Sequence, residues 1–156
     1  MDASAIPLHP IAHVRGGRAE VEDDAWATVG SRIELDATRF GPDALKDLND
    51  FSHLAVIFHF HAADPARLHT GARRPRNTPA WPEVGIFAQR GKDRPNHLGL
   101  SVCAIVKIEG TAIHVRGLDA VDGTPVLDLK PVMKGFEPRV EIREPAWATE
   151  RMAGYW

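Results

Sequence analysis

Apolar side chains recur at every second position along several segments of this chain, and no other feature restricts its fold as strongly. In the clearest segment, Phe51 to His61, even positions are apolar (Leu54, Val56, Phe58, Phe60) and three odd positions are histidines (His53, His59, His61). Successive side chains of a β-strand point to opposite faces, so a period of two predicts a strand with one buried face.

The same alternation predicts five more strands, at Ile11–Val14, Ser31–Leu35, Leu100–Ile108, Ala112–Arg116 and Pro125–Leu129. Glu109-Gly110 and Asp122-Gly123 indicate turns between them. Short helices are expected at residues 41–48 and 145–152, where Pro42 and Pro145 suit a first turn. This pattern predicts a mainly β fold, a closed antiparallel β-barrel with one or two short peripheral helices.

A length of 156 residues predicts a single domain over residues 1–156 with one core. Cys103 is the sole cysteine, which excludes a disulfide framework and paired-cysteine zinc sites. We found neither a run of about 20 apolar residues nor a signal sequence, so we expect a cytoplasmic protein. Trp147 and Trp156, near the end of the chain, are expected to pack on the core or on a second subunit.

Positive charge is concentrated in one part of a chain whose formal net charge is −2. Between Arg67 and Arg94 there are seven cations (Arg67, Arg73, Arg74, Arg76, Arg90, Lys92, Arg94) and two acids (Glu83, Asp93). Such an excess attracts phosphate, although a solvated surface loop has the same composition.

Two segments between the expected strands are candidates for a binding site. The loop from Gly85 to Ser101 is longer than a hairpin needs and carries glycines, cations, Asn96 and His97. The turn Asp122-Gly123-Thr124-Pro125 lies between Asp119 and a further acid, and crowded carboxylates and amides can bind a polar cofactor. Either segment can equally be a plain connection.

Other kinds of chemistry lack their sequence patterns. His59-x-His61 resembles a metal-binding pair of the cupin type, but the carboxylate and third histidine of that type are missing, so we expect no metal. Cys103 lies mid-strand and is expected to be a buried apolar side chain rather than a nucleophile. Neither a dinucleotide-binding glycine motif, nor a phosphate-binding loop, nor a nucleophile elbow occurs.

Four ordered motifs make residues 8 to 138 resemble the TsaA-like (TrmO/YaeB) family, leaving residues 139–156 as a C-terminal extension. The motifs are Phe51-Ser52-His53-Leu54 with Phe60-His61, Gly85-Ile86-Phe87-Ala88-x-Arg90, Arg94-Pro95-Asn96-x-x-Gly99-Leu100-Ser101, and Asp119 with Asp122-Gly123-Thr124-Pro125-Val126-Leu127-Asp128-x-Lys130-Pro131.

The resemblance implies a homodimeric β-barrel methyltransferase that uses S-adenosyl-L-methionine (SAM) and methylates N6 of threonylcarbamoyladenosine beside the tRNA anticodon. By motif match, the residues that bind SAM are His61, Ala62, Arg90, Leu100, Asp122, Gly123, Thr124 and Pro125. An N-terminal loop near Asp24-Ala25-Trp26 matches by position alone, and we expect Trp26 to stack on the adenine. Methyl transfer needs positioning rather than a nucleophile, and Asp122 is a hypothetical proton acceptor. Arg73, Arg74, Arg76 and Arg94 are the expected tRNA contacts.

The chain departs from the family pattern at three places. His97 replaces a proline, Val132 replaces a tyrosine, and Gly16-Gly17 replaces a Ser-Pro pair. These changes leave two alternatives open: SAM-dependent methylation of another RNA or a small molecule, and a non-catalytic SAM-binding regulatory module. The sequence does not identify the methyl acceptor among these alternatives.

Overall fold

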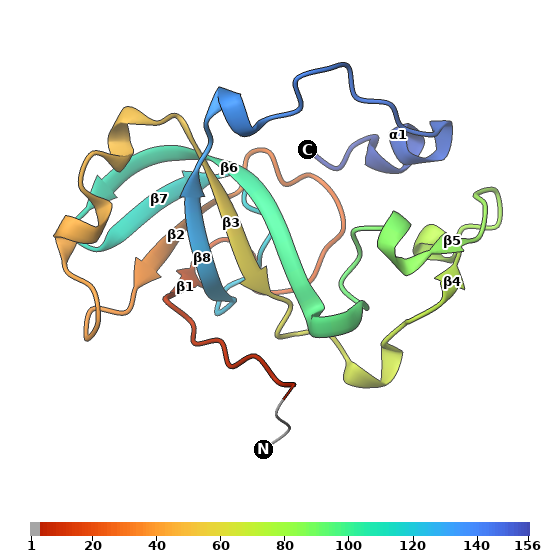
Figure 1. Cartoon of the computed structure of the whole chain (residues 1–156), viewed down its shortest axis with the longest axis horizontal. Helices are drawn as coiled ribbons and strands as arrows, with labels where there is room; N and C mark the ends of the chain where they lie inside the picture. Colours follow the sequence, from red (N-terminus) through yellow and green to blue (C-terminus); the bar gives the residue numbers. More distant parts are fainter. Residues whose placement is uncertain (1–3) are drawn as a thin grey trace.

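Six antiparallel strands close into a barrel in the computed structural model, which describes residues 4–156 (Figure 1). Their order around the barrel is β1-β2-β7-β6-β3-β8. The strands are β1 (Ala12–Arg15), β2 (Gly30–Leu35), β3 (His53–His59), β6 (Leu98–Glu109), β7 (Ala112–Arg116) and β8 (Pro125–Pro131). The barrel confirms the predicted fold class, and each strand overlaps one predicted from the period of two.

The core lies inside the barrel, on the face that the alternation predicts. Leu54, Val56 and Phe58 of β3 are buried, whereas His53 is exposed and His59 is half-buried. Phe58 pairs with Gly99 of β6, and a Cβ added to that glycine would lie 2.5 Å from two ring atoms of Phe58. The ring therefore occupies the space of the missing side chain.

The barrel closes where its first and last strands meet. β1 and β8 pair at Ala12 with Val126 and at His13 with Pro125. Hydrogen bonds extend this seam at both ends, because Ile11 N donates to Val126 O at 2.8 Å and Val14 N donates to Thr124 O at 2.9 Å. The predicted cofactor turn, residues 122–125, thus begins β8 at this seam.

The expected helix at residues 41–48 is not one helix. Two 3-10 segments, Pro42–Leu45 and Leu48–Asp50, are separated by Lys46, whose backbone is not helical, and by Asp47, which is left-handed. Leu45 is buried and Leu48 is partly buried, so two short turns suffice to seat these leucines against the barrel. Pro42 does lie in the first turn, as predicted.

The remaining elements lie beside the barrel. A two-stranded sheet joins β4 (Ala72–Arg73) to β5 (Val84–Gly85), and the α-helix α1 (Ala146–Met152) follows Pro145 (Figure 1). Further 3-10 segments are Pro65–Arg67, Pro75–Asn77, Ile86–Ala88, Pro95–His97 and Lys134–Phe136. Within residues 4–156, no helix combines the length and apolar character needed to cross a membrane.

Candidate functional site

Hydrogen bonds from the N-terminal third of the chain fix the Asp122–Pro125 turn. Gly16 N donates to Asp122 Oδ1 at 2.9 Å, Asp122 N donates to Arg18 O at 2.8 Å, and Gly123 N to Val14 O at 2.8 Å. The buried Thr124 hydroxyl donates to Val121 O at 2.7 Å. Gly123 has a φ of +82°, a conformation that favours glycine. The turn is therefore held rigidly while Asp122 stays at the surface.

His61 lies directly against this turn. A Cβ added to Gly123 would be 3.7 Å from His61 Nε2, which is ordinary contact distance. His61 and Ala62 are exposed just beyond the end of β3. Residues 61, 62 and 122–125, which the motif match assigned to one cofactor site, thus lie together.

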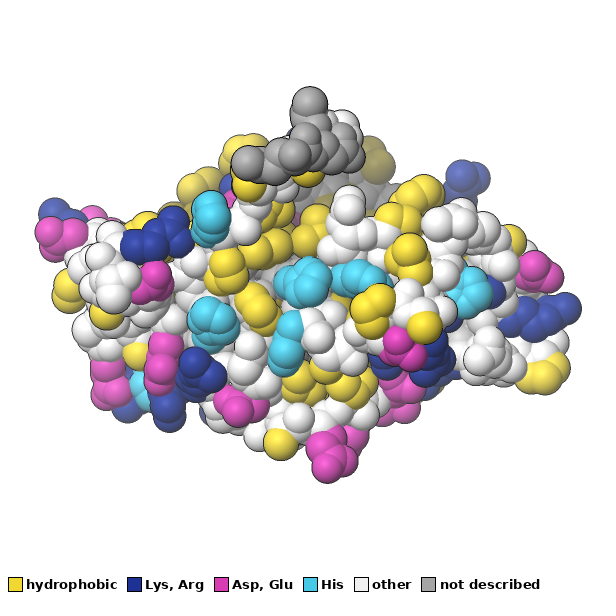
Figure 2. Space-filling view, turned by 90° about the horizontal axis from the view of Figure 1, so that it is seen from below, with side chains coloured by type: hydrophobic (Ala, Val, Ile, Leu, Met, Phe, Trp, Pro, Cys, Tyr) yellow, Lys and Arg dark blue, Asp and Glu magenta, His cyan; other side chains and the backbone are white. Residues whose placement is uncertain are grey.

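Several histidines surround His61, and histidine side chains gather near the centre of the face in Figure 2. Partial removal of the His61 ring from water, together with the neighbouring His59 and His13, lowers its pKa, and the nearby Asp122 carboxylate opposes this shift. His61 is therefore kept neutral near pH 7 beside an anionic carboxylate, an arrangement suited to a bound cation.

The loop from Gly85 to Ser101 provides the other half of the predicted site. Arg90 Nη2 donates to the backbone oxygen of Leu100 at 2.7 Å, and both residues are exposed. His97 Nδ1 lies 2.9 Å from Lys92 O, and its ring meets that of His59 edge-on with centroids 6.1 Å apart. Because a carbonyl only accepts, His97 carries its proton on Nδ1 in this arrangement.

The two halves meet at one end of the barrel. His59, at the end of β3, pairs with Leu98 at the start of β6. Phe60 N then donates to His97 O at 2.8 Å, so His61 leaves the sheet next to the loop that carries Arg90. Among residues 4–156, no group of three or more His, Cys, Asp or Glu side chains is arranged to hold a metal ion.

Trp26 lies in a different environment from the one expected. Its side chain is buried, with 3% exposed, and the Arg18 guanidinium carbon lies 4.4 Å from the centre of its ring. Stacking of Trp26 on an adenine would require Arg18 to leave this position. The segment around it is nonetheless connected to the turn through Arg18, whose side chain also donates to Asp24 O and Ala25 O.

The four arginines expected to contact RNA all have partners within the chain. Arg73 Nη1 lies 3.3 Å from Asp93 Oδ2, and Arg74 donates to Trp81 O. Arg76 Nη2 lies 2.7 Å from Asp24 Oδ1, and Arg94 donates to Gln89 O. These arginines therefore organise residues 67–97, and their contact with RNA stays a prediction.

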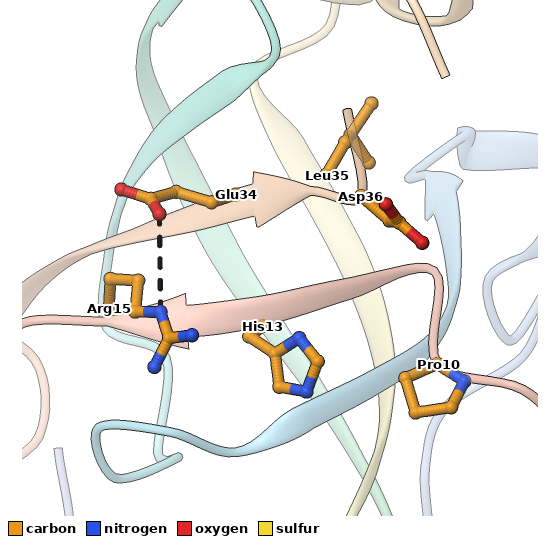
Figure 3. A pocket seen from close by; sticks show the side chains of 6 residues that line it. All are labelled: Pro10, His13, Arg15, Glu34, Leu35 and Asp36. Atoms are coloured by element: carbon orange, nitrogen blue, oxygen red, sulfur yellow. Dashed lines mark ion pairs between the residues drawn. The ribbon is translucent and has the colours of Figure 1, made fainter. Parts of the chain in front are cut away.

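Two pockets lie outside the predicted site. One, of about 270 Å³, is a polar hollow on the outer face of β1 and β2 (Figure 3), lined by Pro10, His13, Arg15, Glu34, Leu35 and Asp36. The other, of about 400 Å³, is mostly apolar and lies over the 3-10 segments at residues 42–50. His13, which lines the first pocket, also contributes to the lowered pKa of His61.

Sequence reasoning missed His13, Arg18 and Tyr155, which come from other parts of the chain and contact residues of the predicted site. No spacing signals them, since each reaches the site only through barrel closure or a return of the chain. Cys103 is buried as predicted, and burial raises the pKa of its thiol to about 12. Trp156 is 51% exposed, so it does not pack on the core.

The chain is similar to several known proteins. A protein from Homo sapiens named tRNA (adenine(37)-N6)-methyltransferase is 35% identical over 102 residues, which are 65% of this chain and 23% of that protein. "Probable S-adenosyl-L-methionine-binding protein PYRAB06630" from Pyrococcus abyssi is 37% identical over 101 residues, 65% of this chain and 52% of that one. The chain thus spans about half the length of one relative and a quarter of the other.

Solved structures share the fold. A crystal structure of TrmO superposes with a TM-score of 0.74 at 28% identity, covering 90% of this chain and 63% of that one. TrmO from Pseudomonas aeruginosa gives a TM-score of 0.69 at 27% identity, covering 89% and 61%. The model of the tRNA-methyltransferase O N-terminal domain matches residues 22–137, most of the barrel. The chain therefore belongs to the family of the tRNA-methyltransferase O N-terminal domain.

Proposed function

We propose that this chain is a SAM-dependent methyltransferase that methylates N6 of threonylcarbamoyladenosine next to the tRNA anticodon. The observation that carries the proposal is the convergence, at one end of the barrel, of the motif residues His61, Arg90, Leu100 and 122–125. The named relatives support the same activity, since they include a tRNA (adenine(37)-N6)-methyltransferase and a SAM-binding protein.

The residues present fit SAM. Asp122 is exposed, and Gly16 N donates to its Oδ1, which fixes a carboxylate that can accept from hydroxyl or ammonium groups. The neutral His61 beside it adds no charge that would repel a sulfonium. Leu100, 51% exposed, offers an apolar surface to an adenine ring. Residues 61, 62, 90, 100 and 122–125 would hold the cofactor, which supplies an electrophilic methyl group when bound.

The chain itself has to position the acceptor and receive its proton. The acceptor nitrogen loses one proton as it gains a methyl group, and we assign Asp122 as the group that orients this nitrogen or accepts the proton. In-line displacement needs no nucleophilic side chain, and positioning alone can supply much of the rate enhancement. Asp122→Asn should therefore lower kcat more than it raises the Kd for SAM.

Phosphate contacts complete the proposal for tRNA. Arg67 is exposed at the edge of the arginine-rich segment, while Arg73, Arg74, Arg76 and Arg94 shape it. We assign these residues to the tRNA backbone. Such contacts release counterions from the RNA, and they weaken at higher salt because that release then gains less free energy. Methylation that does not respond to salt would contradict an RNA acceptor.

Two measurements test the function. Titration calorimetry with SAM should show binding, and its absence would exclude SAM chemistry altogether. Nucleoside mass spectrometry of anticodon-loop fragments, from tRNA treated with the purified protein, should show one added methyl group on threonylcarbamoyladenosine. SAM binding without that product would favour the other acceptors or the non-catalytic module.

A homodimer is part of the proposal. The outward face of β6 also exposes Leu98 and Val102, at 37% and 46%, on either side of Leu100, and Ala55 of β3 pairs with Val102. An apolar stripe of this kind typically marks an interface, and we assign a second copy of the chain to it. Val102→Glu should convert the dimer to a monomer in analytical ultracentrifugation, whereas an unchanged sedimentation coefficient would contradict this assignment.

We also propose that residues 1–156 act as one domain and work in the cytoplasm, where the proposed tRNA acceptor is found. Backbone hydrogen bonds between residues 25–26 and 154–155 tie the C-terminal extension to the rest of the chain and support the first of these statements. A single cooperative unfolding transition in calorimetry would agree with it.

A further inference from the structure

The last residues of the chain form a two-bond ladder with the segment expected to border the cofactor. Ala25 N donates to Gly154 O at 3.0 Å, and Trp26 N donates to Tyr155 O at 2.9 Å. The residues that accept these bonds lie outside residues 22–137, the part that the family model matches. Residues of the C-terminal extension therefore accept hydrogen bonds from a loop of the family domain, in place of water.

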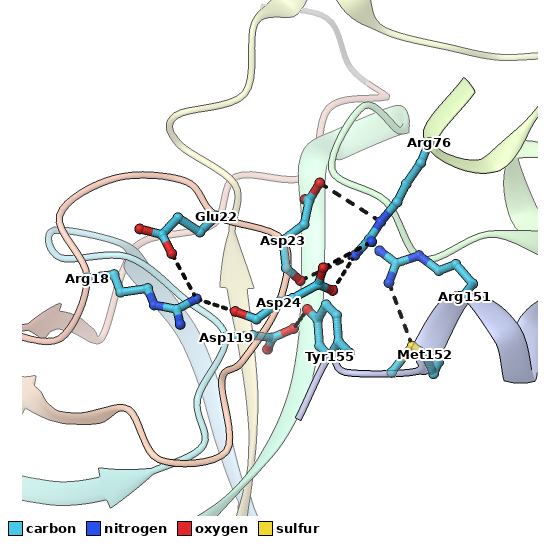
Figure 4. A network of polar contacts seen from close by, with 9 residues as sticks. All are labelled: Arg18, Glu22, Asp23, Asp24, Arg76, Asp119, Arg151, Met152 and Tyr155. Carbon is cyan, nitrogen blue, oxygen red and sulfur yellow. Dashed lines mark hydrogen bonds and ion pairs between the residues drawn. The ribbon is translucent and has the colours of Figure 1, made fainter. Parts of the chain in front are cut away.

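Tyr155 anchors this ladder to the barrel. Its hydroxyl donates to Asp119 Oδ2, and the residue is partly buried (Figure 4). The other carboxylate oxygen, Asp119 Oδ1, is buried and has no hydrogen-bond partner among the described residues. The tyrosine hydroxyl is thus the donor that stabilises a carboxylate largely removed from water.

From this anchor, a closed circuit of contacts leads to the cofactor turn. The Arg18 side chain donates to Asp24 O at 2.6 Å and to Ala25 O at 2.7 Å, while its own backbone oxygen accepts from Asp122 N at 2.8 Å. Asp119, the partner of Tyr155, lies just before Asp122 in the chain, so this set of contacts closes on itself. Displacing Tyr155 would break both its hydrogen bond to Asp119 and its backbone bond to Trp26.

A second set of contacts holds the outer side of the same segment. Arg76 pairs with Asp24 at 2.7 Å, and Trp81 Nε1 donates to Glu150 Oε2 of α1 at 2.9 Å. Figure 4 shows Arg76, Asp24 and Tyr155 grouped around the loop. Residues 24–26 are therefore contacted by Arg18, by Arg76 of the arginine-rich segment and by the C-terminal tail, although Asp24 and Ala25 stay exposed.

We propose that Tyr155 is a positioning residue for the cofactor site. By donating to Asp119 and bonding the backbone of Trp26, it holds residues 24–26 and Arg18 in the arrangement that fixes the turn at Asp122. This inference rests on the proposed function, since it concerns the SAM-binding side of that site. A ligand bound by only one loop arrangement loses apparent affinity in proportion to the population of that arrangement.

Tyr155→Phe tests the proposal because it removes only the hydroxyl. A hydrogen bond to a charged group shifts an equilibrium by about tenfold or more, so the KM and Kd for SAM should rise roughly tenfold. The kcat at saturating SAM and the KM for tRNA should stay unchanged. A purely structural role would instead reduce the active fraction, lowering the apparent kcat at constant KM. Asp119→Asn keeps an acceptor for the hydroxyl and should retain most of the affinity.

Thr149→Ala is the matched control, since its hydroxyl bonds Glu144 within the same extension and it should leave the KM for SAM unchanged. Hydrogen exchange gives a readout that needs no SAM: the amides of Ala25 and Trp26 should exchange about tenfold faster in Tyr155→Phe. Failure of the wild-type protein to bind SAM would remove the proposed function, and exchange would still test the ladder. Wild-type binding with an unchanged Kd in Tyr155→Phe would overturn the inference.

Discussion

Gly99→Ala places a methyl group where the ring of Phe58 now lies. The added Cβ would stand 2.5 Å from Cε2 and Cζ of that ring, about 1 Å closer than ordinary contact. The ring cannot swing into solvent, because Phe58 is 2% exposed and packs edge-on against Phe60 with centroids 5.1 Å apart. Either the ring leaves its rotamer or β3 and β6 separate locally.

The expected cost follows from that crowding. Overpacking a well-filled core typically costs about 1–3 kcal/mol, and we expect about 2 kcal/mol here. For a domain of this size, such a loss lowers the Tm by about 4–8 °C. Urea unfolding followed by circular dichroism should show a lower midpoint with an unchanged m-value.

Two further variants test whether this clash is the cause of the destabilisation. Gly135→Ala is the matched control, since nothing lies within 4 Å of its added Cβ, and it should change stability by less than about 0.5 kcal/mol. Phe58→Leu combined with Gly99→Ala should cost less than the sum of the single changes, because the smaller side chain vacates the contested space. Full additivity, or wild-type stability in Gly99→Ala alone, would refute the proposed clash.

Four other predictions follow from charges and burial. Asp122→Asn should lower the pKa of His61 further in an NMR titration, because the carboxylate is the group that raises it. The pKa of His61 in the folded protein lies below its ordinary value of 6.5, so its contribution to the free energy of unfolding is highest above pH 6.5. That contribution should fall as the pH drops through 6.5 toward the pKa of the folded state. His61→Gln should flatten this slope when unfolding is measured as a function of pH. The thiol of Cys103, buried and with a pKa of about 12, should react with Ellman's reagent only in the denatured protein. Asp93→Ala should cost about 3 kcal/mol by leaving Arg73 unpaired, and limited proteolysis should then cut within residues 67–94, whereas unchanged resistance would contradict this pairing as a support for the segment.

The strands could be predicted from the sequence because their apolar period is read locally. Leu54, Val56 and Phe58 face the core whatever the order of the strands. The hairpin between β6 and β7 is likewise indicated by the glycine in its turn. The helix expected at residues 41–48 was wrong because Lys46 and the left-handed Asp47 leave the helical conformation, and composition does not record those backbone angles.

For the candidate site, the order of the motifs predicted which residues group together but not their other partners. Residues 61, 62 and 122–125 come together because β3 ends beside the start of β8, which a six-stranded antiparallel barrel makes possible. The partners of the arginines could not be predicted, since Asp93 and Asp24 meet them through loops without a regular period. The return of Tyr155 to Asp119 depends likewise on the path of the final residues.

The seam between β1 and β8 requires the first and last strands of the barrel to meet. Its paired residues, such as Ala12 and Val126, are far apart in the sequence. Because closing a long loop costs entropy, we expect this pairing to form late in folding. The turn at residues 122–125 is bonded to residues 14–18 across this seam, and it has no fixed shape until the barrel has closed. Closure and completion of the site are thus one event. A ligand bound at the turn would stabilise the closed barrel, and it should slow the separation of β1 from β8 before that of other strands.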